Sequence, residues 1–187
     1  MGAMGKVYSG IDGRLRGFIE AQPVFFVATA PSGDSGHVNV SPKGMRGTFA
    51  VLDEHRVAYL DYHGSGAETV AHLRSNGRIT VMFCAFGGPP KIVRLHGHGT
   101  VVSVDDLRYP DLAGLFAGSP DQHGARSVIV VDVHRVSDSC GYGVPLMDYR
   151  GERDLLIQAH SRRSEDDLAQ YRAIRNATSI DDLPAFP

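Results

Sequence analysis

The stretch that decides the fold is residues 59–83, which read YLDYHGSGAETVAHLRSNGRITVMF. Its pattern predicts a strand, a glycine loop, a short helix over about residues 67–74 and a second strand. Asn76 and Gly77 predict a left-handed helix end. A glycine loop that opens a helix leaves unpaired backbone N–H groups, and such a terminus can hold a phosphate.

The same loop has a second interpretation. Ser65 and Glu68 have the S-x-x-E spacing of a capping box, in which each side chain satisfies a free amide at the helix start. Capping boxes are common, and a glycine loop alone is a weak motif. The local sequence favours plain capping but leaves phosphate binding open.

Alternating and β-branched stretches on both sides of this segment predict further strands. The predicted strands are residues 23–30, 37–41, 47–52, 56–61, 78–86, 91–104 and 127–138. The first four form two hairpins, because each pair is joined by a short polar turn. The apolar run at 78–86 is expected to be buried on both sides. The glycines at 97 and 99 suit a barrel strand that bends.

Helices are predicted at few places. Residues 13–21 form a short one, and Ser103 is expected to cap a helical segment at 105–118 that Pro110 interrupts. Few helices and six or seven strands, mostly joined by hairpins, indicate a mainly β protein with an antiparallel barrel.

The chain is expected to divide at about residue 149. Residues 1–149 form the barrel domain, and residues 150–187 are polar and charged. Ser164 caps an amphipathic helix in this part, with Leu168, Tyr171 and Ile174 on one side, and an extended tail follows. Because this part is poor in apolar residues, we expect it to pack on the barrel or on a partner subunit.

Composition excludes several classes of protein. The 187 residues include 42% apolar and 21% charged residues, which suits one globular domain. The net charge of −2 argues against a nucleic-acid surface. The two cysteines are too few for a disulfide framework. No run is long enough for a membrane helix and no signal peptide is present, so a soluble cytoplasmic protein is expected.

Candidate catalytic and metal-ligating residues are few. His96 and His98 lie two apart on a predicted strand and therefore share a face. A third ligand at a telling spacing is missing, so no metal site is expected. Cys84 lies in an apolar strand as inert core, and Cys140 lies in a glycine-rich bend, exposed or structural. A barrel with so few catalytic side chains suits a cofactor that brings its own reactivity.

Several cations could surround an anionic cofactor. Lys43 ends the second strand, and Ser41 lies on the same face. Other candidate cations are Arg46, Arg78 and Arg94. Each alone suits a solvated charge, but together with the loop at 64–66 and the Thr69 hydroxyl they could hold a phosphate.

Four segments carry a family resemblance: HVNVSPKG from residue 37, the stretch at 59–83, KIVRLHGHGTVV from residue 91 and SCGYGVP from residue 139. In order and spacing they resemble the pyridoxamine-5′-phosphate-oxidase-like FMN-binding split barrels over about residues 18–147. The resemblance implies a six-stranded split β-barrel that forms a homodimer, with FMN bound in clefts at the dimer interface.

The resemblance also implies which residues meet the cofactor. The strand end at 41–43 would lie along the flavin ring or its phosphate, the segment 65–69 would meet the phosphate, and Arg94 would reach the phosphate or the ribityl chain. The turn at 140–142 would approach the flavin, from either subunit. The implied cofactor-binding residues are Ser41, Pro42, Lys43, Tyr62, Ser65, Gly66, Glu68, Thr69, Arg94, Cys140, Gly141 and Tyr142. Tyr62, His63 and Tyr142 are the nearest candidates for a proton donor, and no catalytic residue is assigned.

Two departures from the family pattern restrict the implied activity. The vitamin B6 oxidases carry Ser-Arg-Lys at the helix start, where this chain has Ala67, Glu68 and Thr69, and the chain has no tryptophan. We therefore expect an FMN-dependent oxidoreductase that acts on another small molecule, with NAD(P)H or a similar electron donor. The alternatives are a non-catalytic flavin- or haem-binding protein, towards which His96 and His98 point, and an F420-dependent reductase.

Overall fold

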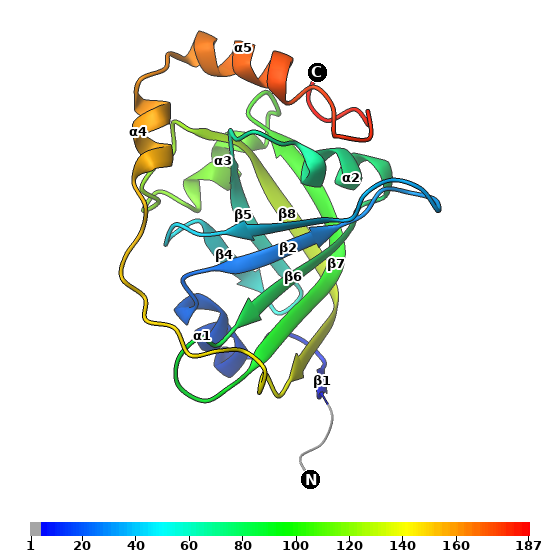
Figure 1. Ribbon diagram of the computed structural model, residues 1–187, viewed down its shortest axis with the longest axis vertical. Coiled ribbons are helices and arrows are strands. Elements are labelled where there is room, and N and C mark those ends of the chain that lie inside the picture. The colour runs from blue at the N-terminus through cyan, green and yellow to red at the C-terminus, as the bar shows by residue number, and fades with distance from the viewer. Residues whose placement is uncertain (1–4) are drawn as a thin grey trace.

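The computed structural model describes residues 5–187, which form one antiparallel sheet and five helices (Figure 1). The strands are β1 (Val7–Tyr8), β2 (Phe25–Thr29), β3 (Asn39–Lys43), β4 (Phe49–Asp53), β5 (Arg56–Tyr62), β6 (Arg78–Cys84), β7 (Ile92–Ser103) and β8 (Ala125–Ser139). The helices are α1 (Gly13–Ala21), α2 (Glu68–Asn76), α3 (Tyr109–Gly114), α4 (Leu155–Ser161) and α5 (Glu165–Arg175). The predicted fold class is confirmed, with eight described strands in place of six or seven.

The sheet is a barrel that stays open along one side. Its order is β3-β2-β6-β7-β8-β5-β4, with β1 paired to β8, so β3 and β4 are the free ends. The two predicted hairpins, β2–β3 and β4–β5, are both present. Across the open side, Lys43 on β3 forms an ion pair with Asp61 on β5 at 2.9 Å. The opening between the two ends is the split of the barrel.

Alternate residues of the strands fill the barrel interior. The largest of these, buried to 5% exposure or less, include Phe25, Val27, Tyr59, Val81, Phe83 and Leu95. The outer face of β4, β5 and β8 packs against α3 and Phe116. The outer face of β3, β2, β6 and β7 has no such helix among the described residues.

Strand β6 corrects one prediction. Its apolar run is not buried on both sides, because Ile79, Val81 and Phe83 point into the barrel while Thr80 and Met82 are partly exposed. In the sequence, Met82 made the strand look continuously apolar. In the structure, the exposure of its side chains alternates along the strand, as it does in the neighbouring strands.

The glycine-rich strand β7 bends where the sequence predicts. Its pairing with β8 shifts register between His96 and Gly97. A Cβ at Gly97 would lie 2.4 Å from the backbone oxygen of Asp132. Glycine is therefore required there, because the neighbouring strand approaches too closely for any side chain.

The helix ends correct two further predictions. Helix α2 begins after Ala67 without a side-chain cap in the described chain, so Ser65 and Glu68 form no capping box. Helix α3 is short and follows Arg108, so Ser103 does not cap it. Before α3, Asp106 accepts the backbone and guanidinium N–H groups of Arg108, whereas Glu68 at α2 bonds to the distant Ile180.

Three local predictions about helices are confirmed. Gly77 ends α2 with a left-handed φ of 71°. Helix α1 spans the predicted residues. Ser164 and Asp167 form a complete capping box at α5, and Leu168 is buried, although Ile174 on the same predicted side is 66% exposed.

The C-terminal part packs across the end of the barrel near α2 (Figure 1). Asn176 donates its side-chain N–H to Gly64 O at 2.9 Å. The tail is not simply extended: it turns back to form a bridge between Thr178 and Pro184, and Phe186 is buried at 3% exposure in the main core. Within residues 5–187, no helix is both long and apolar enough to cross a membrane.

Candidate functional site

A row of polar side chains lines the inner face of β3. Asn39, Ser41 and Lys43 pair with Thr29, Val27 and Phe25, whose side chains point into the barrel. Ser41 Oγ donates to Asn39 Oδ1 at 2.8 Å. Asn39 Nδ2 in turn donates to Thr69 Oγ1 at 3.1 Å, which links β3 to the first turn of α2.

The charged centre of the site is a buried carboxylate between two cations. Asp61 accepts from Lys43 Nζ at 2.9 Å and from Arg126 Nε at 2.7 Å. Asp61 is 1% exposed and Arg126 is 4% exposed. Burial acts to raise the pKa of the Asp61 carboxyl, but Arg126 and Lys43 outweigh it and hold that pKa well below its usual range. We call Lys43, Asp61 and Arg126 the cleft triad; its formal charge is +1.

Arg126 connects the triad to the glycine loop. Its Nη2 donates to Gly66 O at 3.0 Å, and its guanidinium lies 5.2 Å from the ring centre of Phe186. Arg126 Nη1 is buried and has no hydrogen-bond partner within residues 5–187. A buried guanidinium N–H without an acceptor is costly, so this N–H group is the least satisfied part of the triad.

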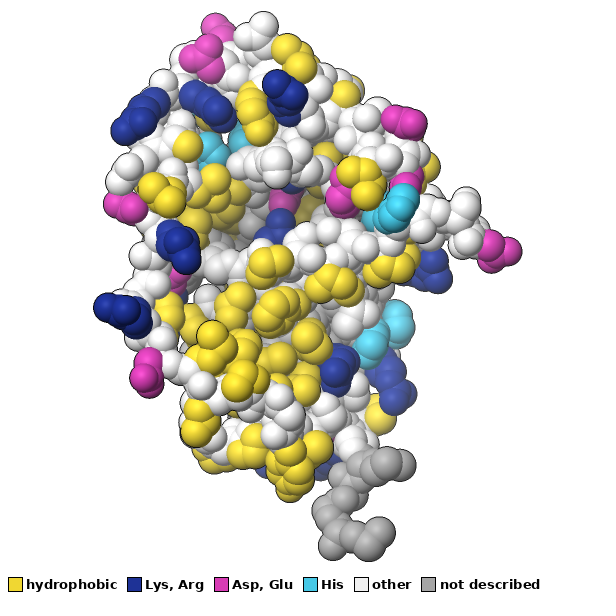
Figure 2. Space-filling view, viewed as in Figure 1, with side chains coloured by type: hydrophobic (Ala, Val, Ile, Leu, Met, Phe, Trp, Pro, Cys, Tyr) yellow, Lys and Arg dark blue, Asp and Glu magenta, His cyan; other side chains and the backbone are white. Residues whose placement is uncertain are grey.

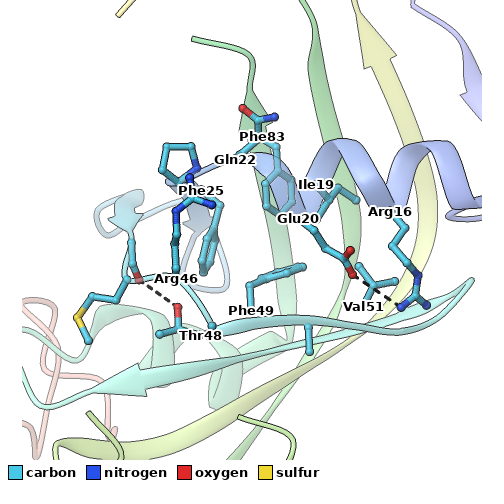
Figure 3. Close-up of a pocket in the computed structure, with 15 residues that line it drawn as sticks. Arg16, Ile19, Glu20, Gln22, Phe25, Arg46, Thr48, Phe49, Val51 and Phe83 are labelled. Atoms are coloured by element: carbon cyan, nitrogen blue, oxygen red, sulfur yellow. Dashed lines mark hydrogen bonds and ion pairs between the residues drawn. The ribbon is translucent and has the colours of Figure 1, made fainter. Parts of the chain in front are cut away.

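A cavity of about 450 Å³ lies between α1 and the loop after Lys43. Its lining begins at Gly44, the residue after Lys43, and includes none of the three triad residues. Its floor contains Phe25, Phe49 and Phe83, whose rings meet at centroid distances of 5.0–5.8 Å. Arg46 lies at one end and the pair Arg16–Glu20 on α1 at the other (Figure 3). We call this the aromatic pocket.

The segment before α4 holds the loop that follows Lys43. Glu152 accepts the backbone N–H groups of Met45 and Arg46, each at 3.3 Å. Tyr149 donates its hydroxyl to Glu152 at 2.7 Å, and the Arg46 guanidinium lies 5.2 Å from the Tyr149 ring. Met45 is held at a φ of +70°, which is strained for a residue with a side chain. The edge of the aromatic pocket is therefore fixed from outside the barrel.

The glycine loop is exposed at Ser65 and Gly66, but an acidic side chain covers the start of α2. Glu68 accepts the backbone N–H of Ile180 at 3.2 Å, and its carboxylate is the nearest atom to a Cβ placed on Gly66, at 3.9 Å. The Glu68 carboxylate thus binds an N–H of the C-terminal tail, whereas the predicted capping box had it accept an N–H at the start of its own helix. A phosphate at this helix end would meet a carboxylate.

The candidate proton donors next to the loop contact the C-terminal helices. The Tyr62 ring stacks on His160 of α4, and burial raises the pKa of Tyr62 to about 12. His63 lies against His160 and Tyr171, and burial lowers the pKa of His63 to about 4. At neutral pH Tyr62 therefore keeps its proton and His63 is neutral. Uncharged rings suit the packing of both residues against His160.

The remaining predicted residues lie outside the barrel. Pro42 is exposed on the outer face of β3. Arg94 is on the outer face of β7, where its Nη1 donates to Ser139 Oγ at 3.0 Å. Cys140 is exposed, Tyr142 is 82% exposed, and Gly141 has a φ of +69° with Lys91 packed against it. The structure thus gathers Ser41, Lys43, Gly66 and Thr69 in the cleft. Ser65 and Glu68 lie at the loop and at the start of α2, and Tyr62 packs on α4. The other predicted residues lie outside the barrel: Pro42, Arg94, Cys140, Gly141 and Tyr142.

Sequence reasoning missed three residues of the site. Asp61 was part of a predicted strand, and its alternation with Val57 and Tyr59 was the available signal for a buried charge. Arg126 and Phe186 gave no local signal. Cys84 is buried as predicted, and burial raises the pKa of its thiol. Within the described part of the chain, no three metal-ligating side chains come together.

The open barrel and the polar cleft between its two ends define a protein of the split β-barrel class. The family model of pyridoxamine 5′-phosphate oxidase matches residues 11–140. The chain belongs to the pyridoxamine 5′-phosphate oxidase family, which confirms the resemblance seen in its motifs.

Individual relatives agree with this assignment. The pyridoxamine 5′-phosphate oxidase family protein ustO of Aspergillus flavus is 40% identical over 193 residues, which cover 96% of this chain and 77% of that protein. HupZ of Group A Streptococcus has a similar structure, with a TM-score of 0.54 and 19% identity over 67% of this chain and 91% of that one. A conserved protein of unknown function from Corynebacterium diphtheriae has a TM-score of 0.50 and 14% identity over 74% of this chain and 99% of that one. The two structures show the shared fold.

Proposed function

We propose that this protein is an FMN-dependent oxidoreductase that acts on a small molecule other than a B6 vitamer. The observation that carries the proposal is the cleft triad beside the aromatic pocket, in a chain of the pyridoxamine 5′-phosphate oxidase family. An aromatic floor with a cationic edge suits a flat, electron-accepting ring that becomes anionic when reduced.

The residues of the cleft fit such a ring. Lys43 uses one of its three N–H donors on Asp61 and keeps 24% of its side chain exposed, so it can also donate to a bound group. Arg126 Nη1 is a further buried donor with no acceptor in the described chain. Ser41 and Thr69 supply hydroxyls on the same side. Phe25 and Phe49 would contact the ring.

Bound FMN would supply hydride or electron transfer, with a nicotinamide as the proposed donor. The chain itself would bind and orient the ring, and its packed aromatic floor would exclude water. The start of α2 offers Glu68 and Thr69 in place of cations, and the sequence contains no tryptophan. These departures are the reason to propose a substrate other than pyridoxamine phosphate.

The flavin proposal predicts that the purified protein binds FMN and quenches its fluorescence. Lys43→Met should weaken FMN binding by about tenfold, because a charged donor is lost from the cleft. Lys91→Met is the matched control, since Lys91 also pairs with a carboxylate and has the same 24% side-chain exposure. Equal affinity in both variants would place the flavin away from Lys43.

A second measurement separates an enzyme from a binding protein. NADH and NADPH are added to the flavin-loaded protein without oxygen, and loss of the oxidised flavin spectrum is followed. Reduction supports the oxidoreductase. Tight flavin binding without reduction by either nucleotide favours a flavin-binding protein, and a Soret band after haem addition with no flavin binding favours a haem-binding protein.

We also propose that two copies pair through the open outer face of the sheet. Val38 and Val40 on this side are 72% and 62% exposed. Figure 2 shows apolar side chains gathered over β2 and β6 in a continuous patch. Large exposed apolar patches mark interaction surfaces. Pro42 and Arg94 lie on the same face, so pairing would bring them close to the other subunit.

The homodimer predicts a clear effect of a charge in the patch. Val40→Glu should convert a dimer to a monomer in sedimentation velocity, because it buries an unpaired carboxylate in an apolar contact. Val7→Glu on β1, where Val7 is 50% exposed, is the control. A wild-type chain that sediments as a monomer at all concentrations would refute the pairing.

A further inference from the structure

The carbonyl groups of the glycine loop are bound by the C-terminal part of the chain. His160 of α4 donates from Nε2 to His63 O at 3.1 Å. Asn176, which follows α5, donates from Nδ2 to Gly64 O at 2.9 Å. The Tyr171 hydroxyl of α5 donates to the same oxygen at 3.3 Å. We call His160, Tyr171 and Asn176 the loop clamp.

The loop clamp is part of a buried network. His160 is 1% exposed and Asn176 is 0% exposed. Asp121 Oδ2 lies 2.6 Å from His160 Nδ1 and fixes the ring, while Asp121 Oδ1 accepts the backbone N–H of Gly124 at 2.9 Å. A side chain at Gly124 would collide with the His160 ring, so only glycine leaves room for it. The clamp is therefore built into the packing of the C-terminal part on the barrel.

The bound carbonyls decide the direction in which the loop presents its N–H groups. In a trans peptide bond, the C=O of one residue and the N–H of the next point in opposite directions, and the described peptide bonds are trans. The carbonyls of His63 and Gly64 point to α4 and to the end of α5. The N–H groups of Gly64 and Ser65 therefore point away from these helices. Neither N–H group has a hydrogen-bond acceptor within residues 5–187, so both are free to meet a ligand.

Local structure alone does not fix this loop. It contains Gly64 and Gly66, which lack the Cβ that restricts the backbone of other residues. No side chain caps the start of α2 in the described chain, and Ser65 and Gly66 are exposed. A further contact is the hydrogen bond from Arg126 Nη2 to Gly66 O at 3.0 Å. The loop is therefore held from two sides, by the clamp and by the cleft triad.

We propose that His160, Tyr171 and Asn176 are positioning residues, which hold the glycine loop in the conformation that a ligand of the cleft binds. This role deepens the proposed flavin function and rests on it for the identity of the ligand. It couples two parts of the chain: the loop is ordered when α4 and α5 are docked, so docking and flavin binding favour each other. Such a coupling is reciprocal, because each event changes the free energy of the other by the same amount.

The first test measures the order of the loop by ¹⁵N NMR relaxation in the protein without flavin. Asn176→Leu removes the donor to Gly64 O together with the unpartnered Oδ1 of Asn176, at similar side-chain size. The order parameters of Gly64 and Ser65 should fall from about 0.85, the rigid range, to below about 0.6. Asn76→Leu is the matched control and should leave both values unchanged. Asn76 also lies at a helix end and donates to a loop carbonyl, Ala30 O, at the same 2.9 Å.

The second test measures FMN affinity by fluorescence quenching. If the loop is ordered in about a tenth of the variant molecules, the apparent affinity falls about tenfold. We expect this loss for Asn176→Leu and a smaller loss for Tyr171→Phe, which keeps the ring and removes only the hydroxyl. Tyr8→Phe, which removes a hydroxyl that binds Asp138, should bind FMN like the wild type. Urea unfolding of each variant separates lost affinity from lost stability.

The coupling also predicts an effect of flavin on the C-terminal helices. At an FMN concentration about 100 times Kd, hydrogen exchange of the α4 and α5 amides should slow by up to about 100-fold, because the flavin binds the docked form. In the double variant Asn176→Leu/Tyr171→Phe, this protection should be lost at the same FMN saturation, since flavin binding then no longer depends on docking.

Several outcomes would overturn the role of the clamp. Unchanged order parameters in Asn176→Leu, or a fall of the same size in Asn76→Leu, would show that other contacts hold the loop. A loosened loop with unchanged FMN affinity would show that the cleft does not depend on its position. If the wild type binds no FMN, the flavin proposal fails by itself, and the NMR comparison without flavin still decides whether the clamp holds the loop.

Discussion

Replacing Asp61 by leucine is expected to lower the free energy of unfolding by about 3–5 kcal/mol. Asp61 is 1% exposed and is the common partner of Lys43 and Arg126. Without it, the 4% exposed guanidinium of Arg126 is left as an uncompensated buried charge. Urea unfolding monitored by circular dichroism measures the change.

Two further variants isolate the cause. Asp61→Leu combined with Arg126→Leu should recover part of the lost stability, because an apolar pair replaces the buried charges. Asp148→Leu, at an exposed position, should change stability by less than about 0.5 kcal/mol. If Asp61→Leu behaves like Asp148→Leu, the carboxylate does not stabilise the barrel.

The ion pairs also predict a pH dependence. The folded pKa of Asp61 is below its unfolded value of about 3.9. The stabilisation is therefore fully present above that unfolded value and is lost as the pH falls towards the folded pKa. Acid unfolding of the wild type below about pH 4 should be steeper than that of Asp61→Leu.

Replacing Phe186 by alanine is expected to destabilise the fold by about 3–5 kcal/mol, although the residue is next to the C-terminus. Phe186 is 3% exposed, packs in the main core and contacts the Arg126 guanidinium. Ile180→Ala is the matched control, since Ile180 lies in the same tail and is 70% exposed. Urea unfolding gives the stability of both variants.

Limited proteolysis provides a second readout for the tail. Phe186→Ala should make the region after Asn176 sensitive to protease, because the turn of the tail then loses its buried anchor. Near-identical stability and protease resistance of wild type, Phe186→Ala and Ile180→Ala would mean that the tail does not dock on the barrel. Docking matters for the site, since the tail covers the start of α2.

The division of the chain near residue 149 stays a prediction. Residues of the C-terminal part reach the barrel at Gly64, His63 and Glu68. Because of these contacts, we expect the C-terminal part to stabilise the barrel. The Phe186→Ala experiment tests this directly.

The sequence by itself determined the strands, the two hairpins and the family. A run of β-branched and aromatic residues predicted β2, Asn76 and Gly77 predicted the end of α2, and Ser164 predicted the start of α5. These features follow from rules that act over a few residues: strand period, left-handed glycine and side-chain capping. Gly97 also belongs here, since a glycine within a barrel strand predicts a bend.

The tertiary structure alone decided what the loop at 64–66 does. The S-x-x-E spacing predicted a capping box, but Glu68 binds Ile180, 112 residues along the chain. Asp61 finds Arg126 at a separation of 65 residues. Which groups form a hydrogen bond or an ion pair depends on which groups are close in space. A local sequence pattern does not show which distant segment will pack beside it. The sequence therefore pointed to a candidate site at β3 and the start of α2, and the fold decided which charged side chains meet there.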